Sequence, residues 1–150
     1  MARLTGTFSP DAGSIQDQHW DSSTPLDNDN QEHLHKPGTN FALAIGATPV
    51  AREEIVFVAK GAAVLRGFHA LCNVTGSTSN VDFDIKKNGT TMLSSTVNVI
   101  NSDADRLVKD GTLSVTAIAA DDVISMELTT TTTTGMQGPF CWAEIDEAAG

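Results

Sequence analysis

The chain has 150 residues, of which 40% are hydrophobic and 19% charged, so it is long enough for one soluble domain with an apolar core. A formal net charge of -10 and a pI near 4.5 argue against nucleic acids and anionic membranes as partners, because both are bound through Lys and Arg. Aromatic residues make up 5% of the chain and Tyr is absent, so the core must be mainly aliphatic.

The first residues contain no apolar run of the kind found in a signal peptide, and no later segment has the length and apolarity of a membrane span. We therefore expect the protein to stay in the compartment where it is made. Two cysteines, Cys72 and Cys141, allow at most one internal disulfide bond. Free buried thiols are the favoured alternative, because Cys often packs as a small hydrophobe in reducing compartments.

Residues 1–41 are predicted to form an extended N-terminal arm. From Phe8 onward this segment is polar, contains three prolines and sustains neither a helical nor a strand period. Isolated apolar residues along it are typical of a chain that lies across a partner and places single side chains in pockets. These candidate anchors are Leu4, Phe8, Ile15, Trp20, Leu26 and Leu34. The alternative is a disordered tail, but an exposed Trp is uncommon there, so Trp20 favours docking.

Two motifs in the arm contain metal-ligand residue types. His33 and His35 would lie on one side of an extended segment, and residues 27–32 supply carboxylate and amide oxygens. The first motif lacks the downstream Glu and His of a cupin-type site, and the second lacks the central Gly and final Glu of a calcium loop. We therefore expect neither a metal nor another cofactor.

After Phe41 the composition changes to Ala, Val, Ile, Gly and Thr, and residues 42–150 are predicted to form an antiparallel β-sandwich. Residues 42–50 are a weak strand candidate, and residues 55–58 are a strong one. Residues 62–74 form a long apolar candidate, in which Gly67 indicates a bulge or bend.

The clearest strand covers residues 81–86, where polar and apolar residues alternate so that three apolar side chains share one face. These side chains are Val81, Phe83 and Ile85. The strand runs into Asn88-Gly89, a pair preferred in type I′ hairpin turns because both central residues need a positive φ. We therefore predict a hairpin whose second strand covers residues 90–100.

Three further strands are expected at residues 112–119, 123–133 and 139–146, and residues 103–109 could hold one helical turn. The threonine run 129–134 is β-branched and suits an exposed edge or an interface. Its candidate self-association residues are Thr129, Thr131 and Thr133. Seven or eight short strands separated by turns predict a sandwich, jelly-roll-like, or a barrel.

Residues 61–67, 81–90 and 119–124 together resemble a recurrent β-sandwich domain of tailed-bacteriophage structural proteins. In that family an apolar strand with a Gly-rich turn precedes a hairpin like Val81-Asp82-Phe83-Asp84-Ile85-Lys86-Lys87-Asn88-Gly89-Thr90, and a strand entry like Ala120-Asp121-Asp122-Val123-Ile124 follows. The resemblance covers about the last hundred residues. It implies a virion role of the capsid decoration or cement type, or a head fibre or part of a tail spike.

No catalytic set emerges from the sequence. His69 and Cys72 are three residues apart in a predicted strand, so they point to opposite faces and cannot form a nucleophile and base pair. The acidic pairs at 103–105 and 121–122 occupy loop positions where Asp commonly caps the backbone. Asn73 and Asn88 satisfy the glycosylation pattern but are interpreted as turn residues.

Three functions remain as hypotheses. The favoured one is a non-enzymatic virion protein, made in the host cytoplasm, that binds the outer capsid surface and stabilises the shell, with the arm clamping neighbouring subunits. Its expected partners are the major capsid protein and copies of itself, a homotrimer being favoured and a dimer possible. The alternative is a receptor- or glycan-binding head or tail fibre tip, for which Phe140 and Trp142 are the aromatic candidates. A hydrolase on a jelly-roll scaffold is the third and least supported.

Overall fold

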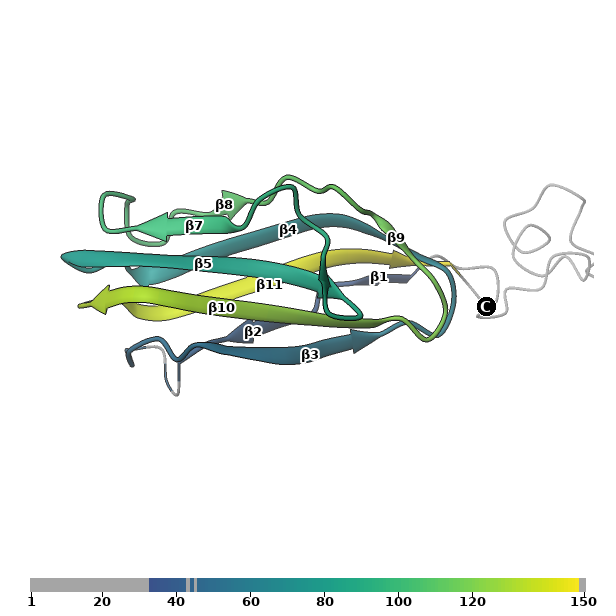
Figure 1. Ribbon diagram of the computed structural model, residues 1–150, viewed down its shortest axis with the longest axis horizontal. Coiled ribbons are helices and arrows are strands. Elements are labelled where there is room, and N and C mark those ends of the chain that lie inside the picture. Colours follow the sequence, from purple (N-terminus) through teal and green to yellow (C-terminus); the bar gives the residue numbers. More distant parts are fainter. Residues whose placement is uncertain (1–32, 43, 45, 149–150) are drawn as a thin grey trace, which may run out of the picture.

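A computed structural model of the chain describes residues 33–42, 44 and 46–148 and shows two antiparallel sheets packed face to face (Figure 1). These residues contain no helix. The predicted all-β sandwich is therefore confirmed. The predicted arm anchors Leu4, Phe8, Ile15, Trp20 and Leu26 lie outside the described residues.

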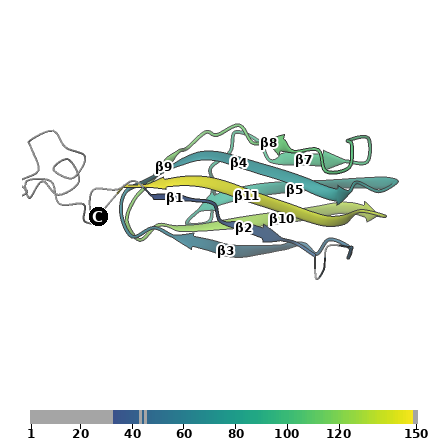
Figure 2. The ribbon, with the colours of Figure 1, turned by 180° about the vertical axis from the view of Figure 1, so that it is seen from behind.

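Sheet A has β4 and β11 at its centre, paired antiparallel, and shorter strands on both sides (Figure 2). Strands β1 and β2 pair with the free side of β11, and β8 and β9 pair with the free side of β4. The strands are β1 (His33–His35), β2 (Gly38–Asn40), β4 (Ala63–Val74), β8 (Lys109–Asp110), β9 (Ala117–Ile118) and β11 (Gln137–Glu147).

Sheet B has β10 and β5 at its centre, with β3 on the free side of β10 and two short strands on the free side of β5. In Figure 1 this sheet lies in front of β4 and β11. Its strands are β3 (Arg52–Val58), β5 (Thr78–Lys87), β6 (Thr90–Thr91), β7 (Val97–Ile100) and β10 (Val123–Thr134).

The sandwich begins earlier than the sequence analysis placed it. Strands β1 and β2, within the segment assigned to the arm, pair with β11, and Phe41 is completely buried. The aromatic ring of Phe41 meets that of Phe83 edge-on, with centroids 6.1 Å apart. Residues 33–41 are therefore structural parts of the domain, and only residues 1–32 remain as a candidate arm.

The predicted bulge in β4 is present. Gly67 pairs with Glu144 and Leu65 with Ile145, so Arg66 is an extra residue on β4. The insertion changes the buried set from odd to even positions. Ala63 and Leu65 face the core before it, and Phe68, Ala70 and Cys72 face the core after it. The same shift fixes which side chains reach the outer face.

The predicted hairpin is confirmed. Asn88 and Gly89 have φ values of 50° and 81°, and Lys87 pairs with Thr90 across a two-residue turn. The amide of Asn88 donates to Asp122, and its oxygen accepts the backbone N–H of Val123, which ties the turn to β10. The second strand of the hairpin, predicted over residues 90–100, is interrupted between β6 and β7. Met92 and Leu93 are both buried, and two consecutive inward side chains break a strand's alternation.

Two other strand predictions are wrong. Of the candidate strand 42–50, the described residues 42, 44 and 46–50 belong to no strand, and the N–H of Val50 donates to the carbonyl of Phe41. Residues 112–119 contain only β9, because their backbone is shared between two partners. Ser114 donates to Met92 near sheet B, whereas Thr116 accepts from Leu65 of sheet A. The helical turn expected within 103–109 is absent from this described segment, which contains turns and β8.

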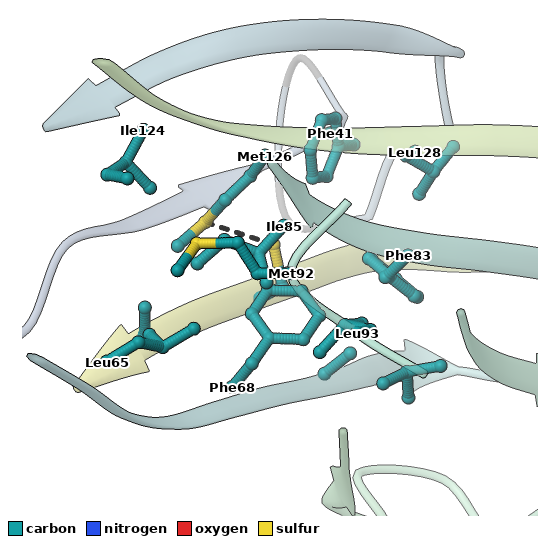
Figure 3. Packing of buried hydrophobic residues seen from close by; sticks show 14 of the residues in the cluster. Phe41, Leu65, Phe68, Phe83, Ile85, Met92, Leu93, Ile124, Met126 and Leu128 are labelled. Carbon is teal, nitrogen blue, oxygen red and sulfur yellow. Dashed lines mark hydrogen bonds between the residues drawn. The ribbon is translucent and has the colours of Figure 1, made fainter. Parts of the chain in front are cut away.

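The core between the sheets is aliphatic, aromatic and sulfur-rich (Figure 3). Val81, Phe83 and Ile85 are fully buried, as their alternation predicts. Cys72 and Cys141 are both free and buried, and the Cys141 thiol lies 3.4 Å from the sulfur of Met126. Sixteen further buried hydrophobic residues in the described part of the chain complete the core cluster around them.

Candidate functional site

The outer face of sheet A carries a row of stacked rings. On β11 the residues Cys141, Ala143 and Ile145 are completely buried, so strand alternation turns Phe140 and Trp142 outward. Their rings stack with centroids 5.8 Å apart and an interplanar angle of 25°. The two aromatic candidates named from the sequence therefore lie on one surface.

His69 extends the row across to β4. It is the register partner of Trp142, and the two rings stack with centroids 4.9 Å apart. The Nδ1 atom of His69 lies 2.7 Å from a carboxylate oxygen of Asp110 on β8. The side chain of Cys72 points into the core instead, so the predicted separation of His69 from Cys72 is confirmed.

Glycine positions make room for these rings. A Cβ added at Gly38 would lie 2.8 Å from Cζ of Phe140, and one added at Gly67 would lie 2.7 Å from Nε2 of His69. Both distances are closer than real Cβ contacts. The absence of a side chain at Gly38 on β2 and at Gly67 in the bulge therefore leaves space for the rings of Phe140 and His69.

A cavity of about 330 Å³ opens on the same face, beside Phe140. Three of its lining residues stand side by side on neighbouring strands: Asn40 of β2, Phe140 of β11 and Leu71 of β4. The remaining lining residues are Asn73, Arg106 and Gly138. The cavity thus has an apolar wall and a polar rim, the combination usual for sites that orient a small ligand.

The loop that carries Arg106 is fastened to the end of β4. Asp105 accepts hydrogen bonds from the N–H and hydroxyl of Thr75, and Asp103 accepts from the N–H of Ile100 and from Lys109. This confirms the interpretation of Asp103 and Asp105 as caps. Arg106 itself has a φ of 60°, held by its N–H donating to the carbonyl of Cys72 at 2.8 Å.

An ionic network covers the outer face of sheet B. The ammonium of Lys86 lies 2.8 Å from Glu127 and 3.2 Å from Glu53, and the hydrogen bond to Glu127 is the main cause that raises the pKa of Lys86. Asp84, directly opposite Glu127, is 7% exposed, and burial raises the pKa of its carboxyl. These groups are paired across strands and form a polar sheet surface, not a cleft.

The predicted self-association residues lie on an open edge. Strand β10 pairs with β5 as far as Thr134, but its pairing with β3 ends at Leu128. In the described part of the chain, residues 129–134 therefore have a strand on one side only. Thr131 is an extra residue in the ladder, and its hydroxyl donates to the carbonyl of Asn80. Bulges of this kind are a common way to limit pairing at an exposed edge.

The root of the candidate arm is joined to β11 by side-chain contacts as well as by strand pairing. Nε2 of His35 lies 3.1 Å from Glu147, and Lys36 lies 2.8 Å from Glu144. The backbone N–H groups of Gly61 and Lys60 also donate to Glu147, and the hydrogen bond from Gly61 is the main cause that lowers the pKa of that carboxyl. Leu34, a candidate anchor, is 56% exposed beside this network.

The sequence pointed to Phe140 and Trp142 but missed the other members of the aromatic face. His69 was assigned to packing, and Asn40, Asn73 and Arg106 were not proposed as binding residues. Register across β2, β11 and β4, together with the loop that carries Arg106, brings them together, and a single sequence carries no direct signal for register between distant strands.

The described residues hold no group of three or more His, Cys, Asp or Glu side chains arranged for a metal ion. In the same part of the chain, no helix has the length and apolarity needed to cross a membrane. Neither a protein-family model nor a curated protein sequence matches this chain.

Proposed function

We propose that this chain is a phage virion structural protein that binds the outer capsid surface and stabilises the shell. In this proposal the sandwich sits on the capsid and residues 1–32 clamp neighbouring copies of the major capsid protein, with no catalytic step. A clamp of this kind adds buried area across subunit boundaries, so separating two subunits also requires stripping the clamp.

The observation that carries the proposal is the attachment of residue 33. Strand β1 pairs with the end of β11, and the contact of His35 with Glu147 and the ion pair of Lys36 with Glu144 reinforce the junction. The residue that directly follows Asn40, the last residue of β2, is Phe41, which is completely buried in the core. A segment that precedes His33 is thus joined to the centre of sheet A, as a clamp requires.

The test is co-sedimentation with empty heads assembled from the major capsid protein of the same phage. The full chain is expected to bind at a fixed number of copies per head. A variant that starts at residue 33 is expected to melt at the same temperature as the full chain and to bind at least tenfold more weakly. Full occupancy by that variant, or no binding by the full chain, would contradict the proposal.

The truncation must stop at residue 32. A variant that starts at residue 42 loses β1, β2 and the buried ring of Phe41, and removing such a ring from a core costs about 3–5 kcal/mol. Its failure to bind would report unfolding, not the loss of the arm.

A receptor- or glycan-binding fibre tip is the second candidate, and one observation favours it. The stacked pair Phe140 and Trp142 stands beside a cavity on the outer face of sheet A.

A further inference from the structure

We infer that the cavity on the outer face of sheet A binds a pyranose that carries a carboxylate, such as a uronic or sialic acid unit. The site consists of Asn40, Leu71, Asn73, Arg106, Gly138 and Phe140. Its volume of about 330 Å³ is at the small end of ligand pockets, which span roughly 300–1,000 Å³. The site thus suits one or two sugar units.

The apolar part of the cavity fits one face of a sugar ring. Phe140 is half-buried, is backed by Trp142 and is confined by Gly38, so its ring is held in place before any ligand arrives. Leu71 continues the apolar surface on the neighbouring strand. The C–H groups on a pyranose face are weakly positive and pack well against the negative face of an aromatic ring.

Arg106 supplies the positive charge that would bind the carboxylate of the ligand. Among the described cationic side chains, only those of Arg106 and Lys60 form no ion pair. The Nε of Arg106 donates to Asn73, and neither terminal nitrogen has a partner among the described residues. A guanidinium with two free nitrogens presents the planar pair of donors that matches a carboxylate.

The backbone at Arg106 supports a binding role. A φ of 60° is unfavourable for a residue with a side chain, and such strain persists where the surroundings enforce it. Here the enforcing contacts are the hydrogen bonds to Cys72 and Asn73 and the adjacent cap by Asp105. Their joint effect is to hold an unpaired cation at the rim of an apolar cavity.

The rest of the rim provides hydrogen bonds for hydroxyl groups. The side-chain oxygens of Asn40 and Asn73 are used within the protein, by Ala42 and Arg106, and their amide N–H groups have no partner in the described region. These groups are therefore available as donors. The net charge of -10 repels anions in general, so a carboxylate ligand depends on Arg106.

Isothermal titration of the full chain tests the site with two matched pairs of probes. The first pair is tetragalacturonate and its neutral methyl ester, and the second is sialyllactose and lactose. We expect an acidic probe of at least one pair to bind at millimolar or lower concentration, roughly tenfold more tightly than its neutral partner. The pair that responds identifies the type of acidic sugar.

Three variants make the test specific. Arg106→Gln should remove the preference for the acidic probe, and Phe140→Ala should weaken the acidic and neutral probes alike. Lys60→Gln removes the other unpaired cation, far from the cavity, and should bind like the unaltered chain. Thermal unfolding of each variant confirms that it is folded, and all three should bind empty heads normally, since the arm is intact.

The inference is overturned if neither acidic probe binds at 10 mM, a concentration that corresponds to a binding free energy of about 3 kcal/mol. Equal affinity for acidic and neutral probes, or equal losses in Arg106→Gln and Lys60→Gln, would also overturn it. Because capsid binding is measured in a separate experiment, a negative result for sugar binding would not contradict the proposal that residues 1–32 clamp the capsid.

Discussion

Gly76 and Gly89 share the same backbone angle, with φ at 81°, but their surroundings differ. A Cβ at Gly89 would meet nothing within 4 Å, whereas one at Gly76 would lie 2.4 Å from the carbonyl oxygen of Thr134. The first position therefore tests backbone strain alone, and the second tests strain plus a clash with a neighbouring turn.

We predict that Gly89→Ala lowers the free energy of unfolding by about 1–2 kcal/mol, the usual cost of a left-handed L-residue. Gly76→Ala should cost at least twice as much, because backbone atoms must move to admit the methyl group. Urea unfolding of the two variants measures the difference. Equal costs would show that the contact at Gly76 relaxes freely.

Asp84 gives a prediction about pH. Burial raises the pKa of its carboxyl above the ordinary value of 3.8, and Thr91 donates a hydrogen bond to it at 2.6 Å. A raised pKa means that the folded state binds the proton more tightly than the unfolded chain does. The contribution of Asp84 to stability is therefore lost as the pH rises from about 3.8 through the folded pKa.

Asp84→Asn should accordingly stabilise the protein at pH 7, because the amide keeps an acceptor for Thr91 without a charge to desolvate. The gain should vanish below pH 3.8, where the carboxyl is protonated in both states. Glu53→Gln is the contrasting control. The hydrogen bond from Ser125 lowers the pKa of Glu53, so its removal should destabilise at pH 7 and matter less in acid. Denaturant unfolding at several pH values distinguishes the two signs.

At the scale of elements, local sequence patterns predicted the features that depend on neighbours in the chain. The alternation in β5, the Asn88-Gly89 turn and the Gly67 bulge each follow from adjacent residues and were confirmed. The strand predicted over residues 112–119 was wrong. Polar and apolar residues alternate there, but the backbone hydrogen bonds of the segment are divided between the two sides of the sandwich. The pairing of β1 and β2 with β11 was missed because three-residue strands carry too little pattern.

The open edge of β10 leads to a test of self-association. Thr131→Lys combined with Thr133→Lys places two charges on residues 129–134 without changing the core, and lysines on an edge oppose strand addition. If this edge joins copies of the chain, the variant should become a monomer by light scattering at a concentration where the unaltered chain is oligomeric.

Ile55→Lys on β3 is the matched control, since Ile55 is 70% exposed and β3 is an edge strand of the same sheet. It should leave the mass unchanged. If Ile55→Lys alone produced a monomer, the self-association surface would be assigned to β3 and not to residues 129–134.

On the scale of the whole molecule, the sandwich keeps its two thiols away from solvent. Burial raises the pKa of Cys72 to about 12, and burial also raises the pKa of Cys141. Only the thiolate reacts, so neither cysteine should be modified by a thiol reagent at pH 8 within minutes, and both should react in 6 M urea. Rapid labelling of the native protein, measured by mass spectrometry, would show that the sheets separate.

The candidate site shows the limit of sequence reasoning at this scale. Phe140 and Trp142 were identifiable because aromatic residues are scarce in the chain. Arg106 was not identifiable, because its position depends on a hydrogen bond to Asn73, which lies 33 residues earlier in the sequence. Such a contact depends on the complete fold and has no local pattern.

The place where β1 joins sheet A determines how the domain would respond to mechanical tension. Hydrogen bonds of an antiparallel pair run perpendicular to the strands, and His33 pairs with Glu147 at the outer end of β11. A pull on His33 against the opposite end of the sandwich would shear all the β1 bonds together. A pull between His33 and Glu147 would instead peel them one by one. The same junction would therefore be strong against a force along the sandwich and weak against one that separates its neighbouring ends.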